Sequence, residues 1–261
     1  MRIIDTPANA AVAEPADPAR TGTASAARDR DAETRIQQAV DELEEDIVLG
    51  YLHPRERLVE DDLRARFDLK RHVARQILQE LEKMGLVERK KNVGAQVKSY
   101  TAKEVVDLYT VREILETHCV RQIAFPVSRE RLDELAAIQR RHDAAVTESN
   151  LRAAFRANIA FHKAFFALSD NASFTELIEF AAQRAHSIRS LSIIFPHYLE
   201  KARQEHWKLI EALGDGDQER LVALCRDHLI PSRDAYIEQH RHREGKPERA
   251  GGPLPSNPKA G

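Results

Sequence analysis

Three histidines and one asparagine interrupt apolar helical stripes in the C-terminal half of the chain. Asn158 and His162 are four residues apart in the stretch 151–168, so they share one helical face. His206 and His228 occupy equivalent positions in two later stretches. Burying several polar groups costs free energy unless they share partners, and one divalent metal ion would satisfy all four. Imidazole suits Zn, Ni, Cu or Fe, and three nitrogens leave coordination positions open. Hydrogen-bonded core histidines are the alternative that this pattern leaves open.

A second group of residues could bind nucleic acid. Residues 35–62 hold three Lys/Arg against nine Asp/Glu, whereas residues 63–100 hold ten against four, a local net charge of +6. Lysine and arginine bind phosphate, and Arg or Gln can form paired hydrogen bonds with base edges. The alternatives are an ordinary solvated surface and a protein-interaction module. The candidate DNA contacts from this pattern are Lys70, Arg71, His72, Arg75, Gln76, Lys90 and Lys91.

The elements that must position the basic residues form a compact pattern. An apolar helical stripe ends at Gly50, a favourable residue just after a helix. A short helix over 58–67, a turn and a helix over 71–84 follow. Two strand-like runs, 86–91 and 95–98, then flank a glycine-containing turn. Three helices followed by a hairpin predict a winged helix-turn-helix.

From residue 101 onward the periodicity is helical throughout, so the fold class is mainly α. The pair Thr101 and Glu104 has capping-box spacing, and Ser128 and Asp217 are suitable N-caps. Pro231 falls inside the last helix, where a kink is expected. The six predicted helices span about 102–124, 129–147, 151–168, 174–194, 198–213 and 218–240.

The composition limits the class of protein and the compartment in which it acts. The 261 residues are 42% hydrophobic and 31% charged, with a net charge of −2. Neither a membrane-spanning run nor the apolar region of a signal peptide is evident, and two cysteines cannot form a disulfide framework, so we expect a cytoplasmic protein. The expected organisation is a disordered arm (1–33), a DNA-binding domain (34–100), a helical domain (101–241) and a disordered tail (242–261).

Motifs with intact spacing run through residues 34–100. They are Gly50-Tyr51-Leu52-x-Pro54, Arg57-Leu58-x-Glu60-x-x-Leu63, Phe67, Arg71-x-x-x-Arg75, Leu81-Glu82-x-x-Gly85-Leu86-Val87 and Gly94-x-x-Val97. This set resembles the DNA-binding domain of GntR-type bacterial transcription regulators. The resemblance implies that Arg71 and Arg75 contact DNA and that Gly94 lies at the wing tip. The sequence departs from the family in having Arg55, Lys70, Val73 and Val93 in place of Gly, Ser, Pro and Arg.

Residues 101–240 carry a second set of motifs. They are Leu108-Tyr109-x-x-Arg112-x-x-Leu115-Glu116, Asn158-x-x-x-His162, Glu205-His206-x-x-Leu209-Ile210, Gly214-Asp215 or Gly216-Asp217, and His228-Leu229. They resemble the helical effector domain of the FadR-like branch of the GntR regulators, the FCD type, in which an Asp and three His bind a metal. The resemblance implies a divalent ion, zinc first, with nickel or manganese as alternatives. Carried over by position, the ligands are Asn158, His162, His206 and His228.

The effectors of that family are typically small carboxylates that complete the coordination of the metal. The resemblance places Arg112 facing the pocket, and guanidinium binds carboxylate with two hydrogen bonds. Arg189 and His186 are further effector-binding candidates, for which a solvated face or an interface ion pair is the alternative. Asn158 stands where the family has Asp. The lost negative charge should weaken cation binding and leave the metal more attractive to an anion.

These features predict a ligand-responsive transcription regulator, a homodimer on a pseudo-palindromic operator and a repressor released by a small carboxylate. A metal-dependent, hydrolase-like enzyme is one alternative, because three histidines with an open position also describe catalytic zinc sites. Against it, no buried carboxylate base is expected beside the ligands, since Glu205 should project from another face. The other alternative is a constitutive DNA-binding protein whose helical domain is purely structural.

Overall fold

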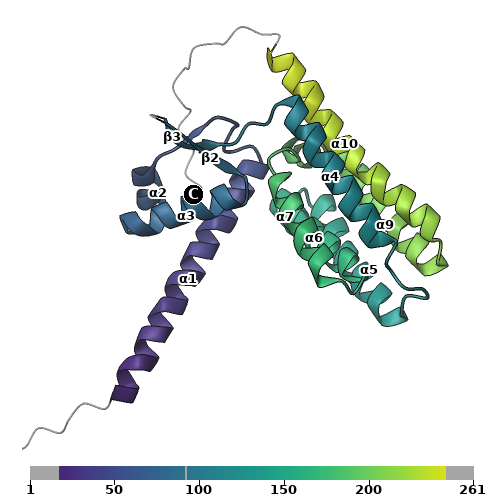
Figure 1. Ribbon diagram of the computed structural model, residues 1–261, viewed down its shortest axis with the longest axis horizontal. Helices are drawn as coiled ribbons and strands as arrows, with labels where there is room; N and C mark the ends of the chain where they lie inside the picture. Colours follow the sequence, from purple (N-terminus) through teal and green to yellow (C-terminus); the bar gives the residue numbers. More distant parts are fainter. Residues whose placement is uncertain (1–17, 92, 245–261) are drawn as a thin grey trace, which may run out of the picture.

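The computed structural model describes residues 18–91 and 93–244, which form two domains (Figure 1). The first contains helices α1 (Pro18–Val48), α2 (Glu60–Phe67) and α3 (Arg71–Lys83). Helix α3 is strongly amphipathic. Its apolar side, with Ile77, Leu78 and Leu81, is buried against the other two helices, and its charged side remains exposed.

A three-stranded antiparallel sheet completes this domain. Strand β3 (Gly94–Val97) lies between β1 (Arg57–Leu58) and β2 (Val87–Lys90), with Leu58 opposite Ala95 and Val87 opposite Val97. The predicted winged helix-turn-helix is therefore present. Leu58 was expected to begin the second helix, but it pairs with β3 together with Arg57, and α2 starts at Glu60.

Helix α1 is longer than the sequence analysis predicted. The segment 18–33 was expected to be disordered, yet it continues the helix that packs on α3. The alanines of the segment 18–33 have high helix propensity. The packed part of the helix, from Ala39 to Val48, supplies the helical nucleus from which this segment extends. The predicted tail begins inside the last helix, since residues 242–244 belong to it. Residues 1–17 and 245–261 lie outside the described part of the chain.

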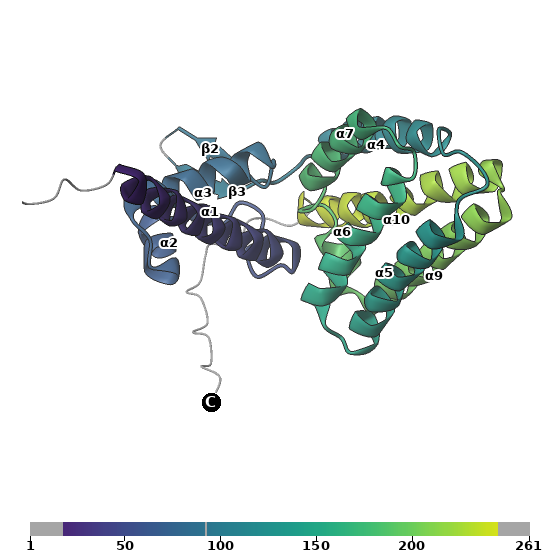
Figure 2. The same ribbon diagram turned by 90° about the horizontal axis from the view of Figure 1, so that it is seen from below.

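The second domain is all-helical, as expected. Helices α5 and α6 pack side by side, as do α9 and α10, while α4 packs on both α7 and α10 (Figure 2). The predicted caps form: Thr101 and Glu104 make a complete capping box, and Ser128 caps α5. No helix in the described ranges is long and apolar enough to cross a membrane. The elements are α4 (Ala102–Val120), α5 (Arg129–Thr147), α6 (Leu151–Ala167), α7 (Ala172–Arg184), α8 (Ser190–Ile194), α9 (Pro196–Asp215) and α10 (Gln218–Glu244).

One predicted helix is broken in two. The single helix expected over 174–194 ends at Arg184, and a turn precedes the short helix α8. The turn carries His186, which bonds Glu44 of α1, and Arg189, which bonds Asn158 of α6. A continuous helix would not direct both side chains to these partners, and local periodicity gives no sign of such long-range contacts.

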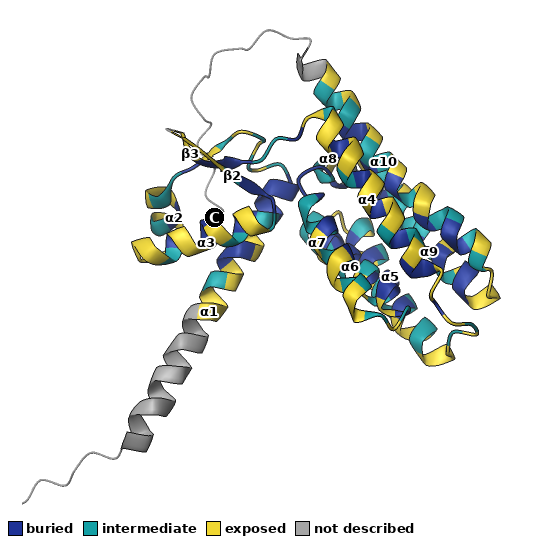
Figure 3. Ribbon diagram, viewed as in Figure 1, coloured by how far each residue is buried: buried dark blue, intermediate teal, exposed yellow. Residues whose placement is uncertain are grey.

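The end of α1 that lies next to the helical domain is buried (Figure 3). Val48 and Leu49 at the end of α1 pack with Phe155 and Ile193 of the helical domain. On the other side, the Tyr100 backbone N–H donates to the hydroxyl of Tyr236 on α10 at 3.0 Å, and the Tyr100 hydroxyl donates to the carbonyl of Gly85. Burial raises the pKa of Tyr100 to about 12, so its hydroxyl remains a donor. The domains are therefore in direct physical contact.

Candidate metal centre and DNA-binding face

Three histidines from different helices converge inside the second domain. His162 of α6, His206 of α9 and His228 of α10 each offer one ring nitrogen, and these atoms all lie within 4.8 Å of one another. The Nε2 atoms of His162 and His228 are 3.3 Å apart. Two nitrogens bound tetrahedrally to zinc at about 2.0–2.1 Å would stand at about this separation. The spacing fits a first-row divalent ion.

Hydrogen bonds on the far side of two rings direct their Nε2 atoms toward the centre of the triad. The Nδ1 of His206 is 2.8 Å from Oε1 of Gln139, and the Nδ1 of His228 is 2.7 Å from Oε2 of Glu205. Each oxygen accepts the Nδ1 proton, so the lone pair lies on Nε2, as in metal-binding histidines held by outer partners. The buried Nε2 of His206 has no hydrogen-bond partner among the described residues. This orphaned acceptor is what a metal ligand requires.

The position of Glu205 corrects the sequence analysis, which placed it on another face. It lies against His228, and both residues line a cavity of about 40 Å³ beside the three histidines. The carboxylate contacts the outer nitrogen of that ring, opposite the converging Nε2. Glu205 therefore orients the imidazole of His228 as a metal ligand. This position does not suit a catalytic base acting on a metal-bound molecule.

The protonation state of two of the three histidines also suits a metal. Burial, followed by repulsion from neighbouring imidazoles and arginines, holds the pKa values of His162 and His206 well below the usual histidine value. Both rings are therefore neutral at physiological pH. Because metal ligands must be deprotonated, ion binding does not require either ring to lose a proton from an imidazolium.

Asn158 lies one helical turn before His162, in the wall of the cavity that also contains His228. Its Oδ1 accepts a hydrogen bond from Arg189 at 3.1 Å, and its buried Nδ2 has no partner within the described chain. The amide oxygen is thus shared with a guanidinium. Coordination of a metal by Asn158 stays a prediction.

Two cavities adjoin the triad, and Arg112 and Arg189 line both. The smaller, about 40 Å³, is bounded by His142, Asn158 and His228. The larger, about 200 Å³, lies between α4, α6 and α7 and reaches His162 and His186. A cavity of about 150 Å³ can hold a benzene-sized molecule, so the larger one has room for a small metabolite.

The predicted effector residues fall into two groups. Arg112 is buried on α4, where its Nε donates to Glu116 at 2.8 Å and its Nη1 has no partner in the described ranges. Burial and the nearby Arg112 lower the pKa of Arg189 to about 10, so an anion beside both would stabilise their charges. His186 lines only the larger cavity, where its Nδ1 is 2.5 Å from Glu44.

In the first domain, the predicted reading helix is exposed along its polar side. Lys70 precedes α3 without a side-chain cap, and Arg71, His72, Arg75 and Gln76 all lie on the solvent side. Acidic residues of α2 hold both arginines: the Nε of Arg75 is 2.9 Å from Glu60, and Arg71 is 3.7 Å from Asp61. These pairs orient the arginines and must rearrange for any contact with a base.

The wing supplies a second exposed basic surface. Lys90 and Lys91 end the β2 side of the hairpin, and Lys90 pairs with Glu88 at 2.9 Å. Gly94 opens β3 with a φ of 89°, a conformation that glycine adopts without strain. The exposed Arg57 of β1 lies beside it, with Nε 3.8 Å from where a Cβ would stand. Sequence reasoning missed Arg57 as a wing residue.

An ion-pair network between the domains was also missed, and we define it as the α1–α6 network. The buried Glu45 of α1 accepts from Arg152 at 2.6 Å and also pairs with Arg156. The neighbouring Asp46 accepts from Arg152 at 2.8 Å and from Arg66 of α2 at 2.6 Å. The available signal was a run of acidic residues at the end of the first helix and two arginines four residues apart. The helix that bears Asn158 and His162 thus also holds the DNA-binding domain.

Comparisons with known families match both domains. The protein-family model described as "Bacterial regulatory proteins, gntR family" matches residues 35–97. The protein-family model described as "FCD domain" matches residues 107–230. Together they span most of the chain and divide it where the structure does. No curated protein matches the chain significantly.

Solved structures share the fold. A transcriptional regulator GntR from Rhodococcus sp. RHA1 is 22% identical, with a TM-score of 0.67 over 78% of this chain and 98% of that one. McbR/YncC from E. coli is 18% identical, with the same TM-score over 79% and 98%. Lar of Listeria monocytogenes is 20% identical, with a TM-score of 0.53 over 78% and 96%. At this identity the likeness concerns architecture alone.

Proposed function

Because this chain is a GntR-family transcription regulator with an FCD domain, we propose that it is a repressor released from DNA by a small carboxylate bound at a metal site in the helical domain. The observation that carries the proposal is the convergence of His162, His206 and His228 beside the buried Arg112 and Arg189. Zinc is the ion we propose, with nickel or manganese as alternatives. The family consists of regulators and not of enzymes.

The metal would supply a fixed positive charge with open coordination positions for a carboxylate oxygen. The chain's own residues do the rest. Gln139 and Glu205 hold two imidazoles with Nε2 toward the centre. Arg112, whose buried Nη1 has no partner in the part of the chain that the structure describes, and Arg189 provide donors for a second oxygen. Asn158 adds no negative charge, so the site retains a stronger attraction for anions than a carboxylate at that position would leave.

Helix α6 offers the route from this site to DNA. It carries Asn158 and His162 in the cavity walls, and its first two turns hold Glu45 and Asp46 through the α1–α6 network. A small shift of α6 on ligand binding would change how α1 is held, and α1 packs on α3. By linkage, a carboxylate that weakens DNA binding is itself bound less tightly by the DNA complex.

We propose that the chain acts in the cytoplasm as a homodimer on a pseudo-palindromic operator of double-stranded DNA. Large apolar side chains remain exposed on the neighbouring helices α4 and α7 of the protomer: Val111, Ile114, Leu177 and Phe180. Such a surface is typical of an interface, and a two-fold dimer presents two reading helices to two half-sites.

The test uses a duplex selected from random DNA by the zinc-loaded protein. Small carboxylates that raise the melting temperature are carried into fluorescence anisotropy with that duplex. We expect at least one to weaken DNA binding by about ten-fold or more in zinc-loaded protein and to have no effect after chelation. DNA binding that is the same in all conditions would support a constitutive DNA-binding protein and refute the proposal.

A further inference from the structure

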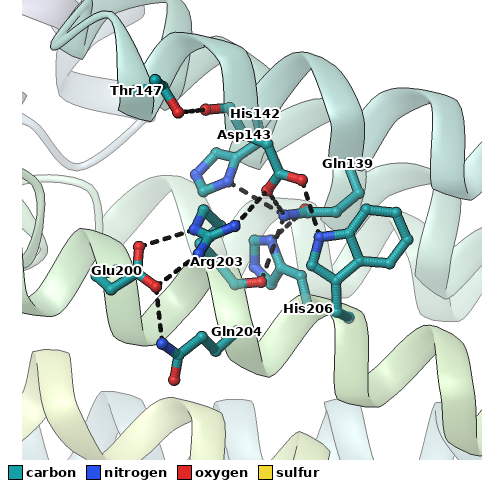
Figure 4. Close-up of polar contacts among 9 residues, drawn as sticks. Gln139, His142, Asp143, Thr147, Glu200, Arg203, Gln204 and His206 are labelled. Carbon is teal, nitrogen blue, oxygen red and sulfur yellow. Dashed lines mark hydrogen bonds and ion pairs between the residues drawn. The ribbon is translucent and has the colours of Figure 1, made fainter.

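One amide on helix α5 contacts two buried histidines (Figure 4). The Oε1 of Gln139 is 2.8 Å from Nδ1 of His206, and its Nε2 is 3.4 Å from Nδ1 of His142. His206 belongs to the converging triad. His142 does not, although its ring centroid is 5.2 Å from that of His206. A single side chain therefore determines the hydrogen bonding of a metal-site histidine and of its neighbour.

The orientation of the amide is fixed by two groups that can only accept. The Nε2 of Gln139 is 2.9 Å from the Asp143 carboxylate and 3.4 Å from the Arg203 carbonyl oxygen, so the amino group must lie at this end (Figure 4). Asp143 is held in turn by the indole nitrogen of Trp207 at 2.9 Å. The carbonyl end of the amide is consequently the one that faces His206.

An amide accepts at one end and donates at the other, so it assigns opposite tautomers to the two rings. His206 must donate from Nδ1 to the Gln139 oxygen, which leaves a lone pair on its Nε2. One amino hydrogen of Gln139 serves Asp143 at 2.9 Å, and the other is left for the Arg203 carbonyl and Nδ1 of His142, both at 3.4 Å. Because an amino group cannot accept a hydrogen bond, Nδ1 of His142 carries no proton toward it, which puts the ring proton on Nε2. Burial lowers the pKa of His142 to about 4, so the ring is neutral at physiological pH and carries that single proton.

The position of His142 allows its Nε2–H to donate a hydrogen bond to a molecule in the cavity. The side chain is almost wholly buried and lines the smaller cavity together with Asn158, Arg189 and His228. Its Nδ1 is occupied by Gln139, so Nε2 is the polar atom that it can offer to the cavity. A protonated nitrogen cannot coordinate a cation, but it can donate to an oxygen. The cavity of about 40 Å³ matches the head of a small carboxylate.

We propose that His142 is an effector-recognition residue: its Nε2–H donates to the carboxylate oxygen of a ligand bound beside the metal, and Gln139 sets that tautomer. The inference rests on the proposed function and adds a recognition residue to it. It also distinguishes the roles of four clustered histidines. His162, His206 and His228 present lone pairs to a cation, whereas His142 presents a proton to an anion.

The tautomers are tested directly by two-bond proton–nitrogen correlation spectra of zinc-loaded protein labelled with nitrogen-15 in histidine. The His142 resonances are assigned by their loss in His142→Asn. We expect the Nε2–H pattern for His142 and the Nδ1–H pattern for His206. An Nδ1–H pattern for His142 would overturn the proposal whether or not any ligand is known.

Recognition is tested with the cobalt-loaded protein and acetate as the probe, followed by visible absorption. His142→Asn removes the donor at the Nε2 position, whereas His142→Gln retains one there. The exposed His118→Asn is the matched control. We expect acetate to bind about ten-fold or more weakly in His142→Asn, with affinity largely retained in His142→Gln and His118→Asn, and no change in the acetate-free cobalt spectrum.

Two results would overturn the role of His142. A changed acetate-free cobalt spectrum in His142→Asn would make it a metal ligand, and equal acetate affinity in all variants would make it structural. No acetate response in wild-type cobalt protein would also refute carboxylate recognition. That failure is distinct from failure of the proposed metal site, in which the cobalt spectrum itself would be missing.

Discussion

The α1–α6 network yields a prediction about how tightly the two domains are joined. Replacing Arg152 with Gln removes its hydrogen bonds to the buried Glu45 and Asp46, at 2.6 and 2.8 Å, and retains the first two methylenes of the side chain. Arg156 and Arg66 remain to pair with the two carboxylates. The change therefore weakens the interface between the domains without leaving an isolated buried charge.

The size of the effect follows from these contacts. A hydrogen bond to a charged group contributes about 1.5–3 kcal/mol. The Arg152 side chain is 40% exposed, so solvent screens part of this. We take about 2 kcal/mol for the pair, which is about 30-fold in the equilibrium between docked and undocked domains. For a domain of 60–100 residues this corresponds to a melting shift of roughly 10 °C.

Differential scanning calorimetry measures this shift. We expect one cooperative transition in the wild-type protein and, in Arg152→Gln, an earlier transition for the DNA-binding domain. Arg129→Gln is the control, because Arg129 forms an ion pair with Asp133 in which the arginine side chain is 87% exposed. Such pairs contribute about 0–1 kcal/mol, so its profile should match the wild type. An unchanged profile in Arg152→Gln would refute the proposed coupling through α6.

Three further predictions concern DNA, metal and pH. Arg75→Ala should weaken binding to the selected duplex by about 5- to 150-fold, which is the contribution of one base contact with two hydrogen bonds. Light scattering should show that the dimer is intact, and full affinity for the duplex would exclude α3 as the reading helix. Asn158→Asp should tighten zinc binding in competition with a chelating dye, because it adds a negative charge beside the triad, and weaker binding would contradict this charge argument. Because burial lowers the pKa of His142 to about 4, below the unfolded value of about 6.5, the unfolded chain binds more protons between these values. The free energy of unfolding should therefore fall as pH decreases from about 6.5 to 4, by up to about 1.4 kcal/mol per pH unit for this group. The slope should be smaller in His142→Asn and unchanged in His118→Asn, and equal slopes would contradict the assignment.

Local patterns predicted the elements of this fold well. Apolar periodicity located α3 and its exposed basic side, and the capping box at Thr101 located the start of α4. These signals lie within a few residues of the structure that they specify. The strand at Arg57 and Leu58 escaped prediction because it exists only through pairing with β3, almost forty residues later.

In the candidate site, too, residues with a local sequence signal were predicted and residues that depend on distant contacts were missed. His162, His206 and His228 stood out because imidazole interrupts an apolar stripe, and they do converge. His142 and Gln139 gave no comparable signal, since their roles depend on where α5 packs against α9. The broken helix between α7 and α8 was missed for a related reason, because its turn is stabilised by partners on α1 and α6.

Elemental mass spectrometry of the purified protein tests the central claim most directly. We expect about one divalent ion per chain in the wild type, very little in His206→Ala or His228→Ala, and a lower melting temperature after chelation. Equal metal content in the variants, or none in the wild type after loading with zinc, nickel or manganese, would contradict it. The three histidines would then be hydrogen-bonding groups in a metal-free cavity.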